Sequence, residues 1–310
     1  MYYDPNSVNN LVESGSRHQQ TVTIVIPVFN VAEYLRTALD SLCEQTISEW
    51  TAICVDDGST DGSGAILDDY AAREPRIRVV HQSNLGVSAA RNVGLEQATG
   101  DVIAFMDPDD VVASDWLARM LAELKDADAV LCGYALNGVS VLSHDVGAVY
   151  AGDDVRRRCW QAFFGYRLRD VPKMLLPGGM WKWCHREMAG VWRLMVRRKA
   201  LGGVRFDPRL LLYEDAMFMT KLSQGLKSLV IAGDCGYGWQ VRSRGAMTRQ
   251  WNERMQANKF LVRDVRREID PEMTHWRGTF LLSALEIFRD RRSVRLLMRY
   301  LRGRSLEGAQ

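Results

Sequence analysis

The chain has 310 residues, of which 47% are hydrophobic and 25% are charged. This composition is typical of a globular protein with a substantial core, and it excludes a disordered chain, a collagen-like fibre and a small disulfide-bonded scaffold. The net charge of +2 conceals an asymmetry, because residues 1–150 carry 8 Lys and Arg against 22 Asp and Glu, whereas residues 151–310 carry 32 against 16. An acidic half of this kind would bind a diphosphate only through a divalent cation.

Residues 1–20 are polar and lack the apolar segment of a secretory signal, so we expect a flexible leader. The longest apolar run, Val22–Phe29, is far shorter than the ~20 residues that a membrane-spanning helix needs. The six cysteines form no CxxC pair, which favours free thiols in a reducing cytoplasm.

Strand and helix patterns alternate in the first half of the chain. Unbroken apolar runs predict strands, and apolar residues at helical spacing predict helices. The expected strands are Thr21–Phe29, Trp50–Val55, Ile77–His81, Asp101–Met106 and Ala129–Tyr134, and the expected helices are Glu33–Gln45, Gly64–Arg73, Val87–Ala98 and Trp116–Lys125. This pattern indicates a parallel sheet with helices on both faces, and ligands bind at the carboxyl ends of such strands.

The second half has a less regular pattern. Residues 139–152 are rich in turn-forming side chains, and 177–179 mark a loop. A helix at Glu214–Ser223, a strand at Ser228–Ala232 and an extended piece at Tyr237–Val241 follow. From about Trp251 the sequence is helical and basic.

Acidic clusters follow two of the predicted strands. Asp107, Asp109 and Asp110 lie within four residues of each other, and Mg²⁺ or Mn²⁺ would offset their mutual repulsion. A helix N-terminus also favours aspartates, and the residue types alone do not decide between the two. No GxGxxG follows the first strand, so the sequence gives little support to a dinucleotide-dependent oxidoreductase. The chain also lacks the glycine-rich phosphate loop that is typical of a nucleotidyltransferase.

Four motifs occur in the order and spacing of one enzyme family. They are Ile26–Asn30 with Gln45–Thr46, then Val55–Asp61, Asn84–Gly94, and Phe105–Asp110 with its Asp-x-Asp element. Over roughly Thr21–Tyr134, and again at Val191–Lys199 and Tyr213–Asp215, the chain resembles the family 2 glycosyltransferases. The resemblance implies an α/β GT-A fold, with a Rossmann-like, mostly parallel sheet, helices on both faces and a helical C-terminal extension.

The resemblance divides the chain into the leader 1–20, a catalytic domain at 21–245 and a basic helical extension at 246–310. Residues 21–135 would bind the nucleotide sugar, and 136–245 would form the acceptor side. The implied reaction moves a sugar from a nucleotide-diphosphate sugar, expected to be UDP-linked, to a hydroxyl acceptor with inversion. We expect a glycan or lipid-linked acceptor in cell-surface polysaccharide synthesis, and we expect no nucleic-acid partner.

The resemblance also assigns residues to the donor: Pro27, Val28, Phe29, Asn30, Asp56, Asp57, Asn84, Ala90, Arg91, Met106 and Asp107. Phe29 would stack on the base, and Asp57 would hydrogen-bond it with support from Asp56. Asp109 would be the direct ligand of Mn²⁺ or Mg²⁺, and Asp107 would contact the ribose or the metal. Turn and cap chemistry is the alternative explanation for Asp56 and Asp61.

Glu214 and Asp215 match the acidic pair of the family at the start of a helix. In inverting members a carboxylate here deprotonates the acceptor hydroxyl, and we favour Asp215, with Glu214 as the alternative. The helix dipole would also favour such a pair. The late histidine of some relatives has no counterpart in 239–244, where Arg242 and Arg244 are the alternative ligands of the diphosphate.

The segment Arg289–Arg304 contains seven arginines with apolar residues between them. Three interpretations stay open: peripheral docking on the inner face of the cell membrane, attraction of a polyanionic acceptor, and an ordinary helix packed on the catalytic domain. Trp160, Trp181 and Trp183 are either acceptor-stacking residues or core residues. The expected location is cytoplasmic, with or without this membrane contact.

Overall fold

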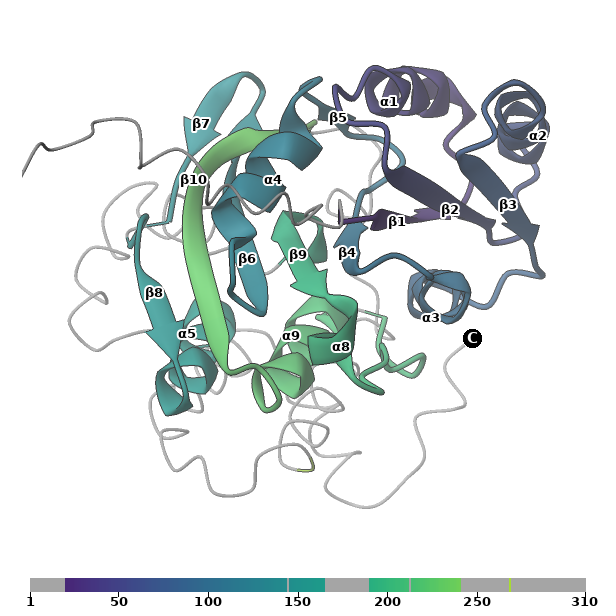
Figure 1. Cartoon of the computed structure of the whole chain (residues 1–310). Helices are drawn as coiled ribbons and strands as arrows, with labels where there is room; N and C mark the ends of the chain where they lie inside the picture. The colour runs from purple at the N-terminus through teal and green to yellow at the C-terminus, as the bar shows by residue number, and fades with distance from the viewer. Residues whose placement is uncertain (1–19, 144, 165–189, 212, 241–267, 269–310) are drawn as a thin grey trace, which may run out of the picture.

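The computed structural model describes residues 20–143, 145–164, 190–211, 213–240 and 268. In these residues a ten-stranded sheet lies between two layers of helices (Figure 1). The strand order is β3-β2-β1-β4-β9-β6-β10-β5, with β7 beside β6 and β8 beside β10. Within the described ranges, no helix combines the length and the apolar character needed to cross a membrane.

The first half of the chain alternates strand and helix, as predicted. Its elements are β1 (Val22–Val28), α1 (Ala32–Cys43), β2 (Trp50–Asp56), α2 (Ser63–Arg73), β3 (Ile77–His81), α3 (Val87–Gln97) and β4 (Val102–Phe105). β3, β2, β1 and β4 pair in parallel, so their carboxyl ends lie at one edge of the sheet.

The second half adds a mixed sheet. Its elements are β5 (Val111–Val112), α4 (Trp116–Leu124), β6 (Ala129–Leu136), β7 (Val139–Val141), β8 (Val149–Ala151), α5 (Asp153–Phe164), the 3₁₀ turn η2 (Val191–Arg193), β9 (Leu194–Arg197), α8 (Arg198–Leu201), α9 (Glu214–Ser223) and β10 (Ser228–Trp239). β9 runs antiparallel to both β4 and β6, and β10 runs parallel to β6. The beginning of β9 and the ends of β6 and β10 therefore lie at the same edge as the end of β4.

Two predicted features of the second half differ from the structure. The turn-rich segment 139–152 contains β7 and β8, which are short strands of three residues at the periphery. The strand and the extended piece predicted around residues 228–241 form a single strand, β10. Its register against β6 shifts at Asp234, where Asp234 Oδ1 accepts the Gly236 N–H and Gly236 adopts a φ of 89°. Only glycine adopts such a φ readily. In the sequence, this irregular part of the strand therefore looks like a gap between two separate extended segments.

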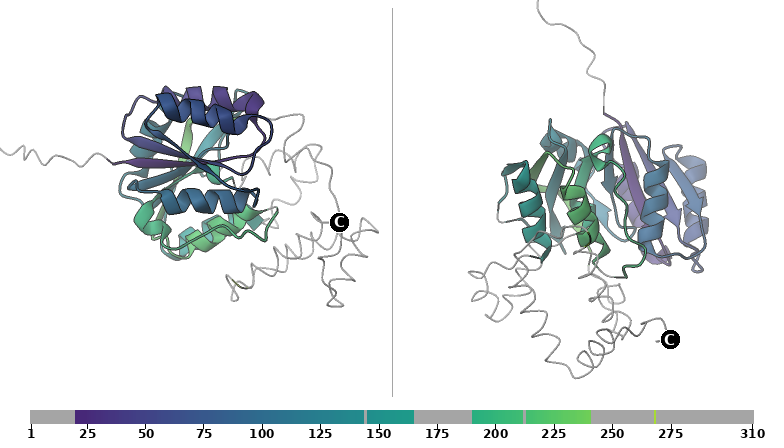
Figure 2. Two further views of the ribbon diagram at one scale, coloured as in Figure 1. Left: turned by 90° about the vertical axis from the view of Figure 1, so that its right-hand side faces the viewer. Right: turned by 90° about the horizontal axis from the view of Figure 1, so that it is seen from below.

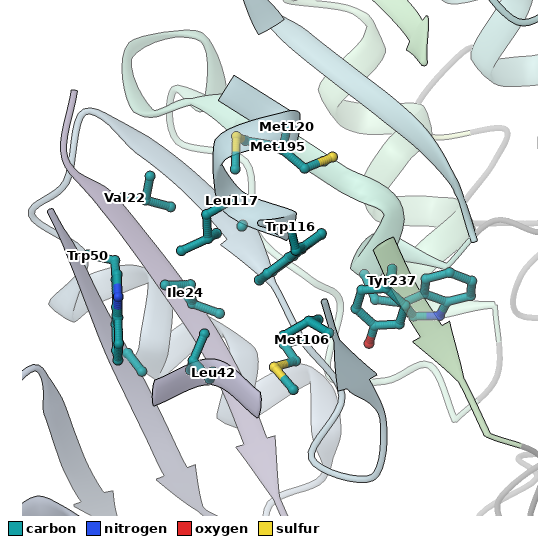
Figure 3. Packing of buried hydrophobic residues seen from close by; sticks show 14 of the residues in the cluster. Val22, Ile24, Leu42, Trp50, Met106, Trp116, Leu117, Met120, Met195 and Tyr237 are labelled. Carbon is teal, nitrogen blue, oxygen red and sulfur yellow. The ribbon is translucent and has the colours of Figure 1, made fainter. Parts of the chain in front are cut away.

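Helices cover both faces of the sheet, as predicted (Figure 2). Val22 and Ile24 of β1 face one apolar cluster with residues of α1, α2 and α4, whereas Val25 faces a second cluster with α3, α5 and α9. This is the alternation expected along a strand. Figure 3 shows the first cluster, with Trp116 of α4 in the middle of the labelled residues.

Helix α3 lies very close to β1, and Gly94 makes this possible. A Cβ atom at this position would collide with the side chain of Val25. The close approach fixes the position of Arg91, which lies one turn earlier on α3.

Candidate active site

The polar strand ends singled out in the sequence meet at one edge of the sheet. Asn30 follows β1, Asp57 follows β2, and Asp107 lies just after β4. The end of β10 is at the same edge, because the Gln240 N–H donates to Asp110 Oδ1 at 3.0 Å. The fold thus gathers distant segments where ligands bind in α/β sheets.

Phe29 and Asn30 form the exposed end of β1. The Phe29 side chain is 39% exposed. Asn30 adopts a left-handed backbone with a φ of 50°, which asparagine tolerates better than most residues. Asn30 Oδ1 accepts the Thr60 N–H at 2.8 Å, and its own N–H donates to Ser59 Oγ at 3.1 Å. The loop after β2 therefore fixes the position of this aromatic end.

Asp57 is buried and holds a loop. Its Oδ1 accepts the Leu85 N–H at 2.8 Å and Gln82 Nε2 at 2.7 Å, and its Oδ2 accepts the Gly86 N–H at 2.8 Å. These bonds keep residues 82–86, including the exposed Asn84, against the end of β2. A contact between Asp57 and a base would be additional to these three bonds.

Asp56 is also buried, and its two oxygens have different partners. Oδ1 accepts the Ser59 N–H at 3.0 Å, and Oδ2 lies 2.9 Å from His81 Nδ1. Burial raises the pKa of Asp56, but the hydrogen bonds from Ser59 and His81 outweigh this effect and hold the pKa below its usual value. The bond to Ser59 is a turn contact of the kind that the sequence offered as the alternative, and the predicted support of donor binding by Asp56 stays a prediction.

The remaining predicted donor residues are buried in the sheet or beneath it: Pro27, Val28, Ala90 and Met106. Ala90 packs against Ile53 and Val55, whereas Val28 and Met106 belong to the larger cluster that includes α1 and α4. Their side chains support the site from the core, so their predicted contact with a donor stays a prediction.

Asp107, Asp109 and Asp110 bring their carboxylate oxygens within 4.8 Å of one another. Asp110 is fully buried, with its Oδ2 accepting the Tyr237 hydroxyl at 2.8 Å and its Oδ1 accepting the Gln240 N–H. Burial, and secondly the charge of Asp107, raise the pKa of Asp110 to about 8. The partly exposed Asp107 and Asp109 offer carboxylate oxygens, which are the ligands that Mg²⁺ and Mn²⁺ prefer.

Arg91 connects this cluster to the second acidic pair. The guanidinium is 4% exposed, and its Nη2 lies 3.2 Å from Asp107 Oδ1. Its Nη1 lies 2.6 Å from Asp215 Oδ1 and 3.3 Å from Glu214 Oε1. The sequence predicted a donor contact for Arg91, and the structure adds three carboxylate partners whose repulsion it offsets.

Glu214 and Asp215 begin α9, as predicted. Tyr213 precedes them in a left-handed conformation with a φ of 63°. Asp215 Oδ2 accepts the Val191 N–H at 3.3 Å, and the side chain is 20% exposed. Burial raises the pKa of Asp215 to about 7, with Glu214 adding to the rise and Arg91 opposing it. A carboxyl group with this pKa is suited to accept a proton at neutral pH.

Sequence reasoning missed Tyr237 and His81. The Tyr237 hydroxyl accepts the Asp107 N–H at 3.0 Å and donates to Asp110, so it anchors the acidic loop. The Trp192 ring stacks on Tyr237, with centroids 4.8 Å apart. No local pattern identifies Tyr237, because its hydrogen-bond partners Asp107 and Asp110 lie more than a hundred positions away. For His81, the signal is its place at the end of a strand in register with Asp56.

Several predicted features lie outside the described residues: Trp181, Trp183, Arg242, Arg244, the extension 246–310 except for Glu268, with Arg289–Arg304, and residues 1–19 of the leader. Trp160 belongs to α5, and its predicted acceptor contact stays a prediction. A hollow of about 360 Å³ is lined by Gln20, Asp101, Arg197, Arg198 and Lys199. It lies where β4 begins, away from the carboxyl ends of the strands, and contains none of the predicted donor residues.

The sheet and its two helix layers form the GT-A fold of the glycosyltransferases that this chain resembles in structure. Residues 23–166 match the family described as Glycosyl transferase family 2. The chain is similar to this family over those residues, as its motifs predicted.

Three similar proteins define the relationship further. EpsJ of Bacillus subtilis strain 168, described as an uncharacterized glycosyltransferase, is 45% identical over 115 residues, which are 36% of this chain and 33% of EpsJ. Residues 1–349 of Staphylococcus aureus TarS in complex with UDP match with a TM-score of 0.54 and 20% identity, over 83% of this chain and 68% of that one. The mannosyltransferase PcManGT of Pyrobaculum calidifontis, in complex with GDP-Man and Mn²⁺, matches with a TM-score of 0.54 and 19% identity, over 91% and 79%. The chain spans about a third of the length of curated relatives such as EpsJ.

Proposed function

We propose that this chain is an inverting glycosyltransferase that transfers a sugar from a UDP-linked donor to a hydroxyl acceptor. The observation that carries the proposal is the arrangement around Arg91, with Asp107 on one side and Asp215 and Glu214 on the other. The first group suits a cation bound to a diphosphate, and the second suits a proton acceptor. The complex of PcManGT with GDP-Man and Mn²⁺ supports a nucleotide-diphosphate sugar as the donor, and the complex of TarS with UDP supports the UDP-linked form.

The donor nucleotide would lie over the ends of β1 and β2. The exposed ring of Phe29 offers a stacking surface for the base, and Asp57 with the loop 82–86 closes the side of this surface. Asn30 and Asn84 are exposed beside it and offer amide groups to the base or the ribose.

Asp109 and Asp107 would hold Mn²⁺ or Mg²⁺ between this nucleotide and the acidic loop. Such an ion supplies positive charge that stabilises the departing diphosphate. Asp110 is assigned a structural part instead, because it is fully buried and its two oxygens accept hydrogen bonds from Tyr237 and Gln240.

Asp215 would act as the general base. Its carboxylate takes the proton of the acceptor hydroxyl, and the hydroxyl oxygen forms a bond to the anomeric carbon from the side opposite the diphosphate. The bond from the anomeric carbon to the diphosphate breaks in the same step, so the diphosphate leaves with the bonding electrons and the sugar inverts its configuration. Arg91 and the Val191 N–H orient Asp215 for this step, and Glu214 contributes to its raised pKa.

The proposed acceptor is a glycan or a lipid-linked saccharide of a cell-surface polysaccharide, in line with the family resemblance. Seven arginines at Arg289–Arg304 are proposed to bring the enzyme to the inner face of the cell membrane, where anionic lipids attract basic segments. Truncation after Phe288 should then move the protein from the membrane fraction to the supernatant, and an unchanged distribution would remove this part of the proposal.

The test is hydrolysis of a panel of nucleotide sugars, including UDP-GlcNAc and GDP-mannose, with Mn²⁺ and with a chelator. We expect slow hydrolysis of a UDP-sugar that requires the metal. A non-catalytic protein of the same fold would bind a nucleotide through Phe29 and hydrolyse none of the panel, which is the result that contradicts an enzymatic function.

A further inference from the structure

His81 lies between two carboxylates at the end of β3. Its Nδ1 is 2.9 Å from Asp56 Oδ2, and its Nε2 is 3.1 Å from Asp68 Oδ1. A neutral imidazole carries a single N–H, so both contacts are hydrogen bonds only when both ring nitrogens are protonated. The geometry is therefore that of an imidazolium held by one buried and one exposed carboxylate, with side chains 8% and 64% exposed.

A short chain of hydrogen bonds leads from this histidine to the end of β1. Asp56 Oδ1 accepts the Ser59 N–H at 3.0 Å, and Ser59 Oγ accepts the Asn30 N–H at 3.1 Å. Asn30 directly follows Phe29, the ring proposed to stack on the base. Although His81 is remote in sequence from both residues, it contacts the carboxylate whose other oxygen accepts the Ser59 N–H.

The surroundings of Asp56 leave it little freedom. A Cβ atom at Gly64, in the first turn of α2, would lie 2.8 Å from Asp56 Oδ2 and 3.6 Å from His81 Cε1. The helix therefore packs directly on the pair. Since Asp56 is buried, a lost hydrogen bond on Oδ2 is not replaced freely by solvent, and such a loss is costly.

We propose that His81 is a positioning residue for the donor nucleotide: its protonated ring fixes Asp56 and, through Ser59 and Asn30, the stacking surface of Phe29. This inference rests on the proposed function and adds a dependence of nucleotide affinity on the protonation of a residue outside the binding site. A neutral ring loses one of its two hydrogen bonds and removes the positive charge beside Asp56, so affinity falls as His81 loses its proton.

Within the described ranges, the charged groups that face His81 are Asp56 on β2 and Asp68 on α2. The hydrogen bond to Asp56, and then that to Asp68, raise the pKa of His81 above its usual value. The neighbouring Asp69 instead pairs with Arg36 and Arg73. Asp68→Asn and Asp69→Asn therefore form a matched pair, in which each removes one exposed charge from α2 but only the first touches His81.

The experiment measures UDP binding with Mn²⁺ by calorimetry between about pH 5.5 and about pH 8.5, the range in which histidine titrates. His81→Gln keeps an uncharged donor for Asp56, and its folding is checked by circular dichroism. The ratio of the His81→Gln to wild-type dissociation constants removes the titration of UDP itself. We expect a ratio of roughly threefold to tenfold at low pH, as for a charged compared with a neutral hydrogen bond, declining towards one at high pH.

A second measurement follows the His81 ring by NMR, assigned with His81→Gln. Asp68→Asn should move both the ring titration and the midpoint of the affinity profile to lower pH, and Asp69→Asn should move neither. A pH-independent ratio, or equal shifts in the two asparagine variants, overturns the inference and leaves the proposed function intact. Failure of the wild-type chain to bind UDP at any pH overturns both.

Discussion

Arg91 Nη1 lies 2.6 Å from Asp215 Oδ1, although the two residues are 124 positions apart in the chain. The contact joins α3, which lies between β3 and β4 in the chain, to α9, which precedes β10. Both side chains are poorly exposed, at 4% and 20%. A buried ion pair contributes little net stability, but removing one partner leaves the other charge uncompensated.

Replacing Arg91 should therefore affect both folding and transfer. Arg91→Met leaves three carboxylates facing each other, and we expect the free energy of unfolding to fall by about 3–5 kcal/mol in urea denaturation. Arg91→Lys keeps the charge but cannot bridge two carboxylate groups as a planar guanidinium does, so it should be more stable than Arg91→Met and still impaired in transfer. Equal stability of Arg91→Met and the wild type would show that the bridge is not formed.

The two residues of the acidic pair should differ in their effect on transfer. Asp215→Asn removes the proposed base, and we expect the transfer rate to fall by about 10²–10⁴-fold while calorimetry shows unchanged UDP affinity. Glu214→Gln should have a much smaller effect. A larger loss in Glu214→Gln than in Asp215→Asn would assign the base to Glu214 instead.

The pH dependence of transfer should reflect Asp215. Burial raises the pKa of this carboxyl to about 7, and only its deprotonated form accepts a proton. The rate at saturating donor and acceptor should rise with pH and level off near or below that value, since a nearby cation lowers the pKa of a carboxyl group. A rate that is flat from acidic to neutral pH would contradict a base with a raised pKa.

Two carboxylates of the acidic loop, Asp109 and Asp110, should differ in role: the first binds the metal and the second supports the structure. Asp109→Asn should abolish the Mn²⁺-dependent part of nucleotide binding, measured as the increase in melting temperature that UDP gives with and without Mn²⁺. Asp110→Asn disturbs the hydrogen bond with Tyr237 and should cost about 1 kcal/mol of stability while leaving that increase in place. If Asp110→Asn alone lost the Mn²⁺-dependent increase in melting temperature, Asp110 would be the metal ligand and Asp109 the structural residue.

Local patterns predicted the first half of the fold because its strands pair with near neighbours in parallel. The apolar runs of β1, β2 and β4 are buried on both faces, and such runs are distinctive in a sequence. In the second half, β9 reaches back to pair with β4, Ala104 opposite Met195. No local signal encodes that partner, and the bulged β10 appears in the sequence as two separate pieces.

In the site, too, some features could be predicted from the sequence and others could not. Its acidic residues could be predicted because strand ends and helix starts place them in recognisable positions in the sequence. The sequence did not show that Asp110 is taken up by Tyr237, or that Arg91 has three carboxylate partners, because these contacts join residues that only the folded sheet brings together.

The insertion of β9 between β4 and β6 has a consequence for dissecting the chain. A fragment ending at residue 135 would contain β1–β4 with the hydrogen-bonding groups of β4 exposed along one side, and β6 would have lost both β9 and β10. Unpaired strand edges of this kind promote aggregation. The predicted division near residue 135 therefore offers no place to cut the chain, and expression trials should keep residues 20–240 together.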